Sequence, residues 1–475
     1  MGKIHEECGV FGIYANQEGA DRHLADTCYY GLFALQHRGQ ESCGIVVNEG
    51  GEYRSFKDVG LVEQVFKPGA LRYLGCGDIA VAHVRYGTTG NSERDNSQPI
   101  VINHVRGKMA LAHNGNLANS KKLREEMEMA GAVFHTTSDT ELISYLITKE
   151  RIHTKTIEEA IAIAMDKLIG AYSLVLMTKS KLIAVRDPYG FHPLCYGQRN
   201  DGSYIIASES CALHAVGAEV IRDIEPGEIL VIDKEGVRSI KDHCGIVKKK
   251  SCVFEYIYFA RPDSDIDGSS VHTARVRAGS MLAIDHPVQA DVVIGVPDSG
   301  LDAAIGYARQ SGIPYGIGLI KNKYIGRTFI APGQKSREEK VRIKLNPVAA
   351  TVAGKRVVMI DDSIVRGTTC GKIVKLLRDA GAKEVHVRVT APPFLYPCYY
   401  GTDIDSSEHL IAYKYSVEEI CRIIGADSLG YLSVRDVVRM AENGKEDEFC
   451  IACFDGKYPT EVPAANNKDV FEDHK

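Results

Sequence analysis

Short apolar runs separated by turns fill the first half of the chain. Runs of strand length occur at 9–14, 43–47, 79–84, 109–113, 172–177, 182–184, 204–207 and 229–232. Amphipathic patterns typical of helices lie between them, at 119–130, 140–147 and 157–168. Asp139, Thr140 and Glu141 can cap the second of these helices. Many strands with few amphipathic helices predict stacked sheets that are flanked by helices.

The second half alternates between strand patterns and helix patterns. Strands are predicted at 291–296, 315–320, 355–360 and 384–390, and helices at 299–309 and 369–380. This alternation predicts a parallel sheet with helices on its faces. Ligands of such sheets bind at the carboxyl ends of the strands, so we expect binding residues there.

The character of the chain changes between residues 233 and 251. A turn sequence at 233–236 precedes the charged run Lys248, Lys249 and Lys250, which indicates a solvated connection and a domain boundary. A chain of 475 residues has room for two or more domains. The net charge of -5 gives no general attraction to nucleic acid or to anionic membranes. No apolar stretch approaches the roughly 20 residues of a membrane span.

One segment of the second half combines a strand, two acids and a helix start. The apolar run 357–360 predicts a buried strand, and Asp361 and Asp362 follow it directly. The next residues open a helix and include Ser363, Arg366, Gly367, Thr368 and Thr369. Backbone N–H groups and the positive helix end can bind phosphate, while the acids can bind sugar hydroxyls and Mg²⁺. A plain helix N-cap with two exposed acids is the alternative, but it does not explain the order of the whole segment.

Two further polar segments accompany this one. The loop 295–300 joins a predicted strand to a predicted helix and contains Asp298 and Ser299, although alone such a sequence is more often only a turn. The stretch 321–342 is long and polar, and it begins with the basic Lys321. We expect it to be a lid over the ligand, with a disordered surface loop as the alternative.

Cys8 lies close enough to the start of the chain to become the first residue after a single cut. Its α-amine, with a pKa of about 7.7–8.0, could then accept the proton of its own thiol. The preceding residues 1–7 lack the apolar centre of a secretory signal and are predicted to be a propeptide. The simpler alternative is a buried cysteine at the start of the first strand.

Several polar residues follow predicted strands of the first half. Arg85 and the pair Asn114 and Gly115 end two strands, and Asp139 opens a helix. Singly, these would be a surface charge, a hairpin turn and a helix cap. Together with Cys8 they resemble the site of the N-terminal-nucleophile glutamine amidotransferases. That resemblance implies that Cys8 attacks glutamine, that Asn114 and Gly115 bind the oxyanion, that Arg85 binds the carboxylate and that Asp139 binds the ammonium group.

The segment 357–369 resembles the phosphoribosyl pyrophosphate (PRPP) motif of type I phosphoribosyltransferases. By this resemblance, PRPP is bound by Asp298, Ser299, Lys321, Asp361, Asp362, Ser363, Arg366, Gly367, Thr368 and Thr369. Ser299, Asp361 and Asp362 are the implied Mg²⁺ ligands.

From Cys8 to about residue 460 the chain resembles the amidophosphoribosyltransferase family. The layout implied is a propeptide at 1–7, an αββα class II glutamine amidotransferase domain at 8–240, a type I phosphoribosyltransferase domain with a parallel sheet at 250–445, and a tail at 446–475. The implied reaction passes ammonia from glutamine through the interior to PRPP and yields 5-phosphoribosylamine, glutamate and pyrophosphate. It is the first committed step of de novo purine synthesis. A cytoplasmic homotetramer that is inhibited by purine nucleotides is also implied.

His192 departs from the family pattern, because an arginine is more usual in its place. Since it lies outside the residues assigned to chemistry, we expect an effect on local contacts only. Two other functions are compatible with parts of the sequence: a PRPP-sensing regulator without catalysis, and an electron carrier that uses the cysteines. A glucosamine-phosphate synthase would share the first half but lacks the pair Asp361 and Asp362.

The thirteen cysteines form no regular framework, which favours a reducing compartment. Cys450 and Cys453 form a C-x-x-C pair, and Cys252 and Cys398 lie far upstream. The pair alone could be metal-binding, redox-active or structural. The family resemblance implies that all four bind a [4Fe–4S] cluster, with a structural Zn²⁺ as the alternative.

Overall fold

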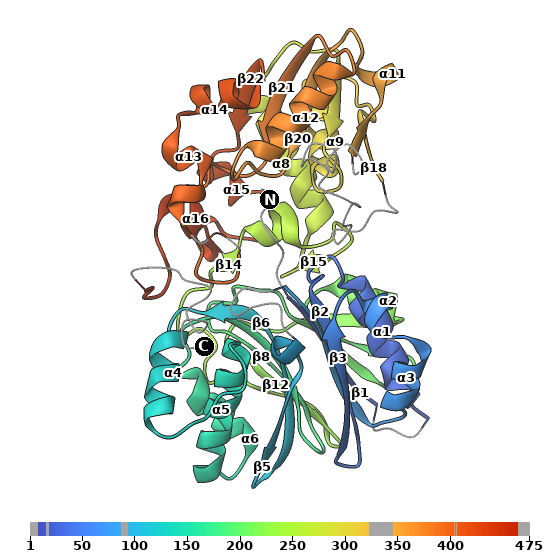
Figure 1. Cartoon of the computed structure of the whole chain (residues 1–475), viewed down its shortest axis with the longest axis vertical. Helices are drawn as coiled ribbons and strands as arrows, with labels where there is room; N and C mark the ends of the chain where they lie inside the picture. Colours follow the sequence, from blue (N-terminus) through green and yellow to red (C-terminus); the bar gives the residue numbers. More distant parts are fainter. Residues whose placement is uncertain are drawn as a thin grey trace.

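The computed structural model describes residues 8–15, 19–86, 94–322, 345–402, 404 and 406–463. The predicted propeptide at 1–7 and most of the predicted lid at 321–342 lie outside these described residues. Figure 1 shows two bodies, with the first half of the chain below and the second half above. In the described part of the chain, no helix is long and apolar enough to cross a membrane.

Two stacked antiparallel sheets form the centre of the first half (Figure 1). The first sheet has the order β11 (Ala218–Asp223), β9 (Cys195–Arg199), β10 (Tyr204–Ala207), β1 (Gly9–Tyr14), β4 (Ile79–Arg85), β2 (Ser42–Glu49) and β3 (Glu52–Val59). The second has the order β13 (Gly236–Ile240), β12 (Ile229–Asp233), β8 (Leu182–Arg186), β7 (Gly170–Met177), β6 (Gly107–Leu117) and β5 (Ile100–His104).

Helices cover the outer face of each sheet. The first sheet is covered by α1 (Leu24–Ala34), α2 (Val62–Val65), α3 (Pro68–Leu74) and α7 (Ser210–Ala215). The second is covered by α4 (Ser120–Met129), α5 (Asp139–His153) and α6 (Ile157–Met165). The residue that caps α5 is Ser138, whose side chain accepts from the N–H of Thr140, whereas the sequence pattern had indicated Asp139 and its neighbours.

Strand β1 explains why these layers form. Val10 and Tyr14 point into the core between the two sheets, while Phe11 and Ile13 point into the core beneath the helices. Because side chains alternate along a strand, an apolar run without polar interruptions must be buried on both faces. The predicted αββα class is therefore confirmed.

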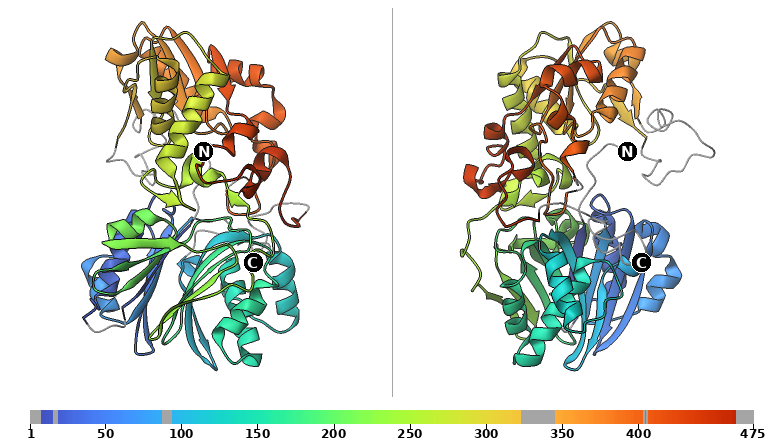
Figure 2. Two further views of the ribbon diagram at one scale, coloured as in Figure 1. Left: turned by 180° about the vertical axis from the view of Figure 1, so that it is seen from behind. Right: turned by 60° about the vertical axis from the view of Figure 1, so that its left-hand side comes forward.

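A parallel sheet with helices on both faces forms the centre of the second half (Figures 1 and 2). Its strand order is β17 (Val292–Gly295), β20 (Arg356–Asp361), β21 (Glu384–Val389) and β22 (Ser428–Tyr431). The main helices are α8 (Val271–Asp285), α9 (Gly300–Ser311), α12 (Thr368–Asp379) and α14 (Val417–Ile424).

The predicted strand at 315–320 is wrong in part. Tyr315 makes only an isolated bridge to Val293. The regular strand is β18 (Leu319–Lys321), which pairs with β19 (Leu345–Pro347) in a separate antiparallel ribbon. Gly316 and Gly318 interrupt this stretch, and glycine weakens strand pairing.

The end of the described chain returns to the start of the second half. Residues 241–250 follow β13 without a helix or strand, and β14 (Ser251–Cys252) then pairs in parallel with β23 (Phe449–Cys450). The register places Cys252 beside Cys450. These four residues therefore connect segments that are about two hundred positions apart in sequence.

Candidate functional site

Cys8 lies immediately before β1 and is almost fully buried, with 5% of its surface exposed. Its Sγ donates to the carbonyl oxygen of Tyr86 at 3.3 Å, and the N–H of Tyr86 donates to Sγ at 3.4 Å. Pairing of β1 with β4 produces this contact, because Gly9 lies opposite Val84. Burial raises the pKa of the Cys8 thiol to about 12.

Three charged residues act on the Cys8 thiol. Arg85 lowers its pKa, whereas Glu41 and Asp139 raise it. Arg85 is buried at the end of β4, and its Nη1 lies 3.9 Å from the carboxylate of Glu41. Asp139 accepts from the N–H of Leu117 at 3.2 Å. The fold therefore brings the predicted glutamine-binding charges to the predicted nucleophile.

Asn114 is completely buried on β6, yet both Oδ1 and Nδ2 lack a hydrogen-bond partner among the described residues. An unpaired buried polar group costs about 1–3 kcal/mol, so this amide is a strong candidate for binding a ligand. Gly115 has φ of +142°, and a Cβ there would lie 2.1 Å from the oxygen of Ala171. Only glycine fits at this position.

Arg38 makes a buried contact with Cys8, and the sequence analysis assigned Arg38 no role. Its Nε donates to the carbonyl oxygen of Cys8 at 3.0 Å, and none of its surface is exposed. The segment 36–41 that contains Arg38 is one of those that resemble the glutamine amidotransferases, but a charged residue is normally exposed to solvent, so its burial was not expected.

The acidic loop of the second half lies at the carboxyl ends of β17 and β20, as predicted for a parallel sheet. Asp361 and Asp362 are buried at the end of β20. Asp362 accepts hydrogen bonds from the hydroxyls of Ser299 and Ser363. Lys321 forms an ion pair with Asp298 at the end of β18. Hydroxyls from the loops after β17 and β20 therefore meet at the carboxylate of Asp362.

Helix α12 begins directly after this loop. Gly367 precedes it with φ of +75°, a conformation that favours glycine. The first turn contains no acidic side chain, and the positive end of a helix favours a bound anion. Arg366 and Thr368 are exposed at this end, and Thr369 is half-buried.

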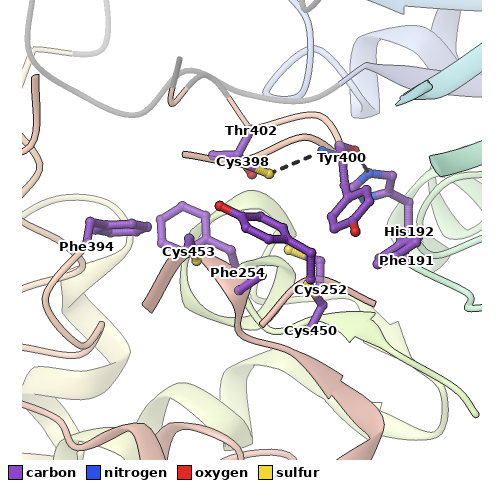
Figure 3. Close-up of a pocket in the computed structure, with 12 residues that line it drawn as sticks. Phe191, His192, Cys252, Phe254, Phe394, Cys398, Tyr400, Thr402, Cys450 and Cys453 are labelled. Carbon is purple, nitrogen blue, oxygen red and sulfur yellow. Dashed lines mark hydrogen bonds between the residues drawn. The ribbon is translucent and has the colours of Figure 1, made fainter. Parts of the chain in front are cut away.

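The four predicted ligand cysteines line one pocket at the junction of the two halves (Figure 3). The remaining lining residues are mainly aromatic: Phe191, His192, Phe254, Phe394, Tyr400, Thr402, Ala452 and Tyr458. Burial raises the pKa of Cys450 to about 12 and that of Cys453 well above its ordinary value, and neighbouring cysteines add to both shifts. Within the described residues, no three His, Cys, Asp or Glu side chains converge as they would on a single metal ion.

Two family models match the chain in the order of its two halves. A glutamine amidotransferase domain matches residues 83–215, and a phosphoribosyl transferase domain matches residues 280–418. The matched parts contain Arg85, Asn114 and Asp139 in the first case, and Asp298 and the 361–369 loop in the second.

Similar proteins span nearly the whole chain. The amidophosphoribosyltransferase of Methanocaldococcus jannaschii is 49% identical over 469 residues, which cover 96% of this chain and 98% of that protein. The one from Bacillus subtilis is 48% identical over 463 residues, covering 97% and 95%. A solved glutamine PRPP amidotransferase from B. subtilis, complexed with ADP and GMP, matches with a TM-score of 0.90 and 46% identity over 98% of this chain and 100% of that one. The chain therefore belongs to the amidophosphoribosyltransferase family.

Proposed function

We propose that this protein transfers ammonia from glutamine to PRPP, which gives 5-phosphoribosylamine, glutamate and pyrophosphate in the first committed step of purine synthesis. One observation carries the proposal. The chain is 49% identical to an amidophosphoribosyltransferase over nearly its full length, and it combines a buried cysteine near Arg85 and Asp139 with an acidic loop suited to phosphate.

In the glutaminase half, Cys8 attacks the side-chain amide of glutamine. Arg85 binds the substrate carboxylate, and Asp139 binds its ammonium group. The amide of Asn114 and the N–H of Gly115 stabilise the oxyanion that forms. The Nδ2 of Asn114 has no partner in the described part of the chain, which supports this role, because a preorganised donor loses no existing hydrogen bond when the oxyanion appears.

Activation of Cys8 requires a base close to the thiol. As long as Cys8 is joined to Glu7 it has no free α-amine, and its raised pKa keeps the thiol protonated at neutral pH. Removal of residues 1–7 creates an amine with a pKa of about 7.7–8.0, which can accept the thiol proton. We therefore propose that residues 1–7 are a propeptide.

In the transferase half, the loop residues 363 and 366–369 bind the phosphate groups of PRPP with backbone N–H groups and hydroxyls. Asp361 and Asp362 bind the ribose hydroxyls. The oxygen donors of Ser299, Asp361 and Asp362 fit Mg²⁺, which prefers oxygen ligands and substrate phosphates. Bound there, Mg²⁺ would neutralise the departing pyrophosphate. Lys321 and Asp298 lie at the edge of this site.

Ammonia must reach C1 of PRPP without entering bulk water, where most of it is protonated at neutral pH. We propose that the stretch 321–342 closes over PRPP and excludes water. Exclusion of water also protects PRPP from hydrolysis.

The donor set of the cysteine pocket fits a [4Fe–4S] cluster. Each thiolate of such a cluster binds a different iron, so the four sulfurs need not converge on one point. Four cysteines around one pocket without a single-ion arrangement among the described residues support the cluster over a Cys₄ zinc site. The cluster would link Cys450 and Cys453 of the tail to Cys252 and Cys398.

We further propose a cytoplasmic homotetramer that purine nucleotides inhibit. The B. subtilis relative that was solved with ADP and GMP supports nucleotide binding by this family.

The test compares two nitrogen sources with one variant. Cys8→Ala should lose pyrophosphate release with glutamine and keep it with ammonia, because only the first half is disabled. Loss of both activities would contradict two separate sites. If the parental protein binds PRPP but releases no pyrophosphate from either source, it is a PRPP-sensing regulator; if it only exchanges electrons, it is an electron carrier.

A further inference from the structure

A buried cluster of charges joins the nucleophile to the second half of the chain. Besides its bond to the carbonyl oxygen of Cys8, Arg38 donates from Nη1 to Glu209 at 2.6 Å. It also donates to both carboxylate oxygens of Glu255, at 3.0 Å and 2.7 Å. Arg38 belongs to the first half and Glu255 to the second, and both are buried. A bidentate pair of this kind fixes the guanidinium in one plane.

His192 continues the cluster from the other side of Glu255. Its Nδ1 lies 3.2 Å from Glu255 Oε1, and its Nε2 lies 2.8 Å from the carbonyl oxygen of Tyr400. Both ring nitrogens thus face oxygen acceptors, to each of which a ring N–H can donate. Although burial opposes a charge on Glu255, Arg38 and His192 hold its pKa well below the usual range. The buried carboxylates of Glu209 and Glu255 are both paired with the buried guanidinium of Arg38.

Tyr400 extends the same chain of contacts to the cysteine pocket (Figure 3). Its N–H donates to Cys398 Sγ at 3.4 Å, and its ring stacks on Phe191 at 4.2 Å. His192, Tyr400 and Cys398 all line that pocket. An unbroken series of hydrogen bonds thus runs from Cys398 through Tyr400, His192, Glu255 and Arg38 to Cys8.

We infer that Glu255 and His192 are positioning residues. Through them, the second half and its cysteine pocket hold Arg38 against the backbone of Cys8. Arg38 in turn orients Cys8 for its reaction with glutamine. This inference rests on the proposed glutaminase activity. Neither residue touches the reacting atoms, since both act on Cys8 through Arg38. At position 192, where an arginine is more usual in the family, the histidine can supply one hydrogen-bond donor to Glu255 and one to Tyr400.

The variants Glu255→Gln, His192→Leu and His192→Arg separate positioning from a general structural role. Glu255→Gln keeps the shape and removes the charge, His192→Leu removes both donors, and His192→Arg can supply both. A small misplacement of a reacting group can cost about 10²-fold in rate. We expect the first two variants to lose about 10- to 100-fold in glutamine-dependent kcat, with little change in the KM for glutamine. His192→Arg should restore most of the loss.

Two readouts keep the test independent of folding. The ammonia-dependent rate should stay within about twofold of the parental rate, since neither Glu255 nor His192 is among the residues assigned to PRPP. Alkylation of Cys8 by iodoacetamide, followed by mass spectrometry, should slow in the first two variants and recover in His192→Arg. Unchanged glutamine-dependent kcat and Cys8 alkylation, or an equal fall in both synthetic activities, would overturn the inference. A parental protein without glutamine-dependent activity would instead refute the proposed function, and the alkylation rates would still decide the positioning role.

Discussion

The hydroxyl of Ser299 donates a hydrogen bond to the carboxylate of Asp362, across 63 positions of sequence. This contact joins the ends of β17 and β20, which are adjacent parallel strands. It gathers the oxygen atoms of two loops at one point, shortly before the N-terminus of α12. The pairing of these strands therefore brings together Ser299 and Asp362, two of the proposed PRPP-site residues.

The double variant Asp361→Ala with Asp362→Ala tests this assembly. It should lower PRPP turnover by at least about 10²-fold, because metal and ribose ligands are lost together. Basal hydrolysis of glutamine should survive, since Cys8 and its neighbours are untouched. Pyrophosphate release and glutamate formation measure the two activities. Asp26→Ala, an exposed acid on α1, is the control. Unchanged PRPP turnover would refute the phosphate site.

Replacement of Asn114 should change catalysis and stability in opposite directions. Asn114→Leu should lower glutamine-dependent kcat by about 10²–10³-fold, which corresponds to about 3–4 kcal/mol of transition-state stabilisation. The same change should raise the free energy of unfolding by about 1 kcal/mol, because it removes unpaired buried polar atoms. Urea unfolding and steady-state kinetics measure the two effects.

Asn48 provides the matched control. It is equally buried, but its Nδ2 donates to the carbonyl oxygens of Thr178 and Lys179, and its Oδ1 accepts from Gly51. Asn48→Leu should therefore destabilise the fold. If Asn114→Leu destabilised the protein as much and left kcat unchanged, the oxyanion assignment would be wrong.

Cys450→Ser tests the group in the cysteine pocket. The variant should lose bound iron and the brown colour of the protein, and it should be less stable, because the tail is no longer attached to the pocket. Iron and sulfide analysis of anaerobically purified protein measures the loss. Cys43→Ser replaces another buried thiol, in the first half of the chain, and should keep all iron. Full iron content in Cys450→Ser would exclude the cluster assignment.

The reactivity of Cys8 should depend on pH in two different ways. In the uncleaved chain, the thiol pKa of about 12 means that the thiolate fraction rises about tenfold per pH unit between pH 7 and 10. After removal of residues 1–7, the α-amine accepts the thiol proton, so the alkylation rate should level off near pH 8. Iodoacetamide labelling at several pH values distinguishes the two forms. Identical profiles would argue against activation by the amine.

Local patterns predicted the parts of the fold that depend on neighbouring residues. The apolar run of β1 and the acidic loop after β20 are both contiguous in sequence, and both lie where their patterns indicated. Strand β3 was missed because its residues, Glu52–Val59, are polar and largely half-buried, so they show no apolar run. The regular strand at 319–321 was misplaced because pairing with β19 is not encoded in its own residues.

The charge cluster around Arg38 could not be predicted from one sequence. Arg38 and Glu255 are 217 positions apart, and each is a charged residue of a type that usually lies on the solvated surface. Only the packing of the two halves shows that they are buried together. The same holds for His192, whose expected effect on local contacts extends to Glu255 and to Tyr400 of the cysteine pocket.

The mass of the intact chain in a fully active preparation shows whether Cys8 is the first residue of the working enzyme. If Cys8 supplies both nucleophile and base, every active molecule must begin at Cys8, and residues 1–7 must be absent from its mass spectrum. A preparation with full glutamine-dependent activity that still retains Met1 would contradict the account.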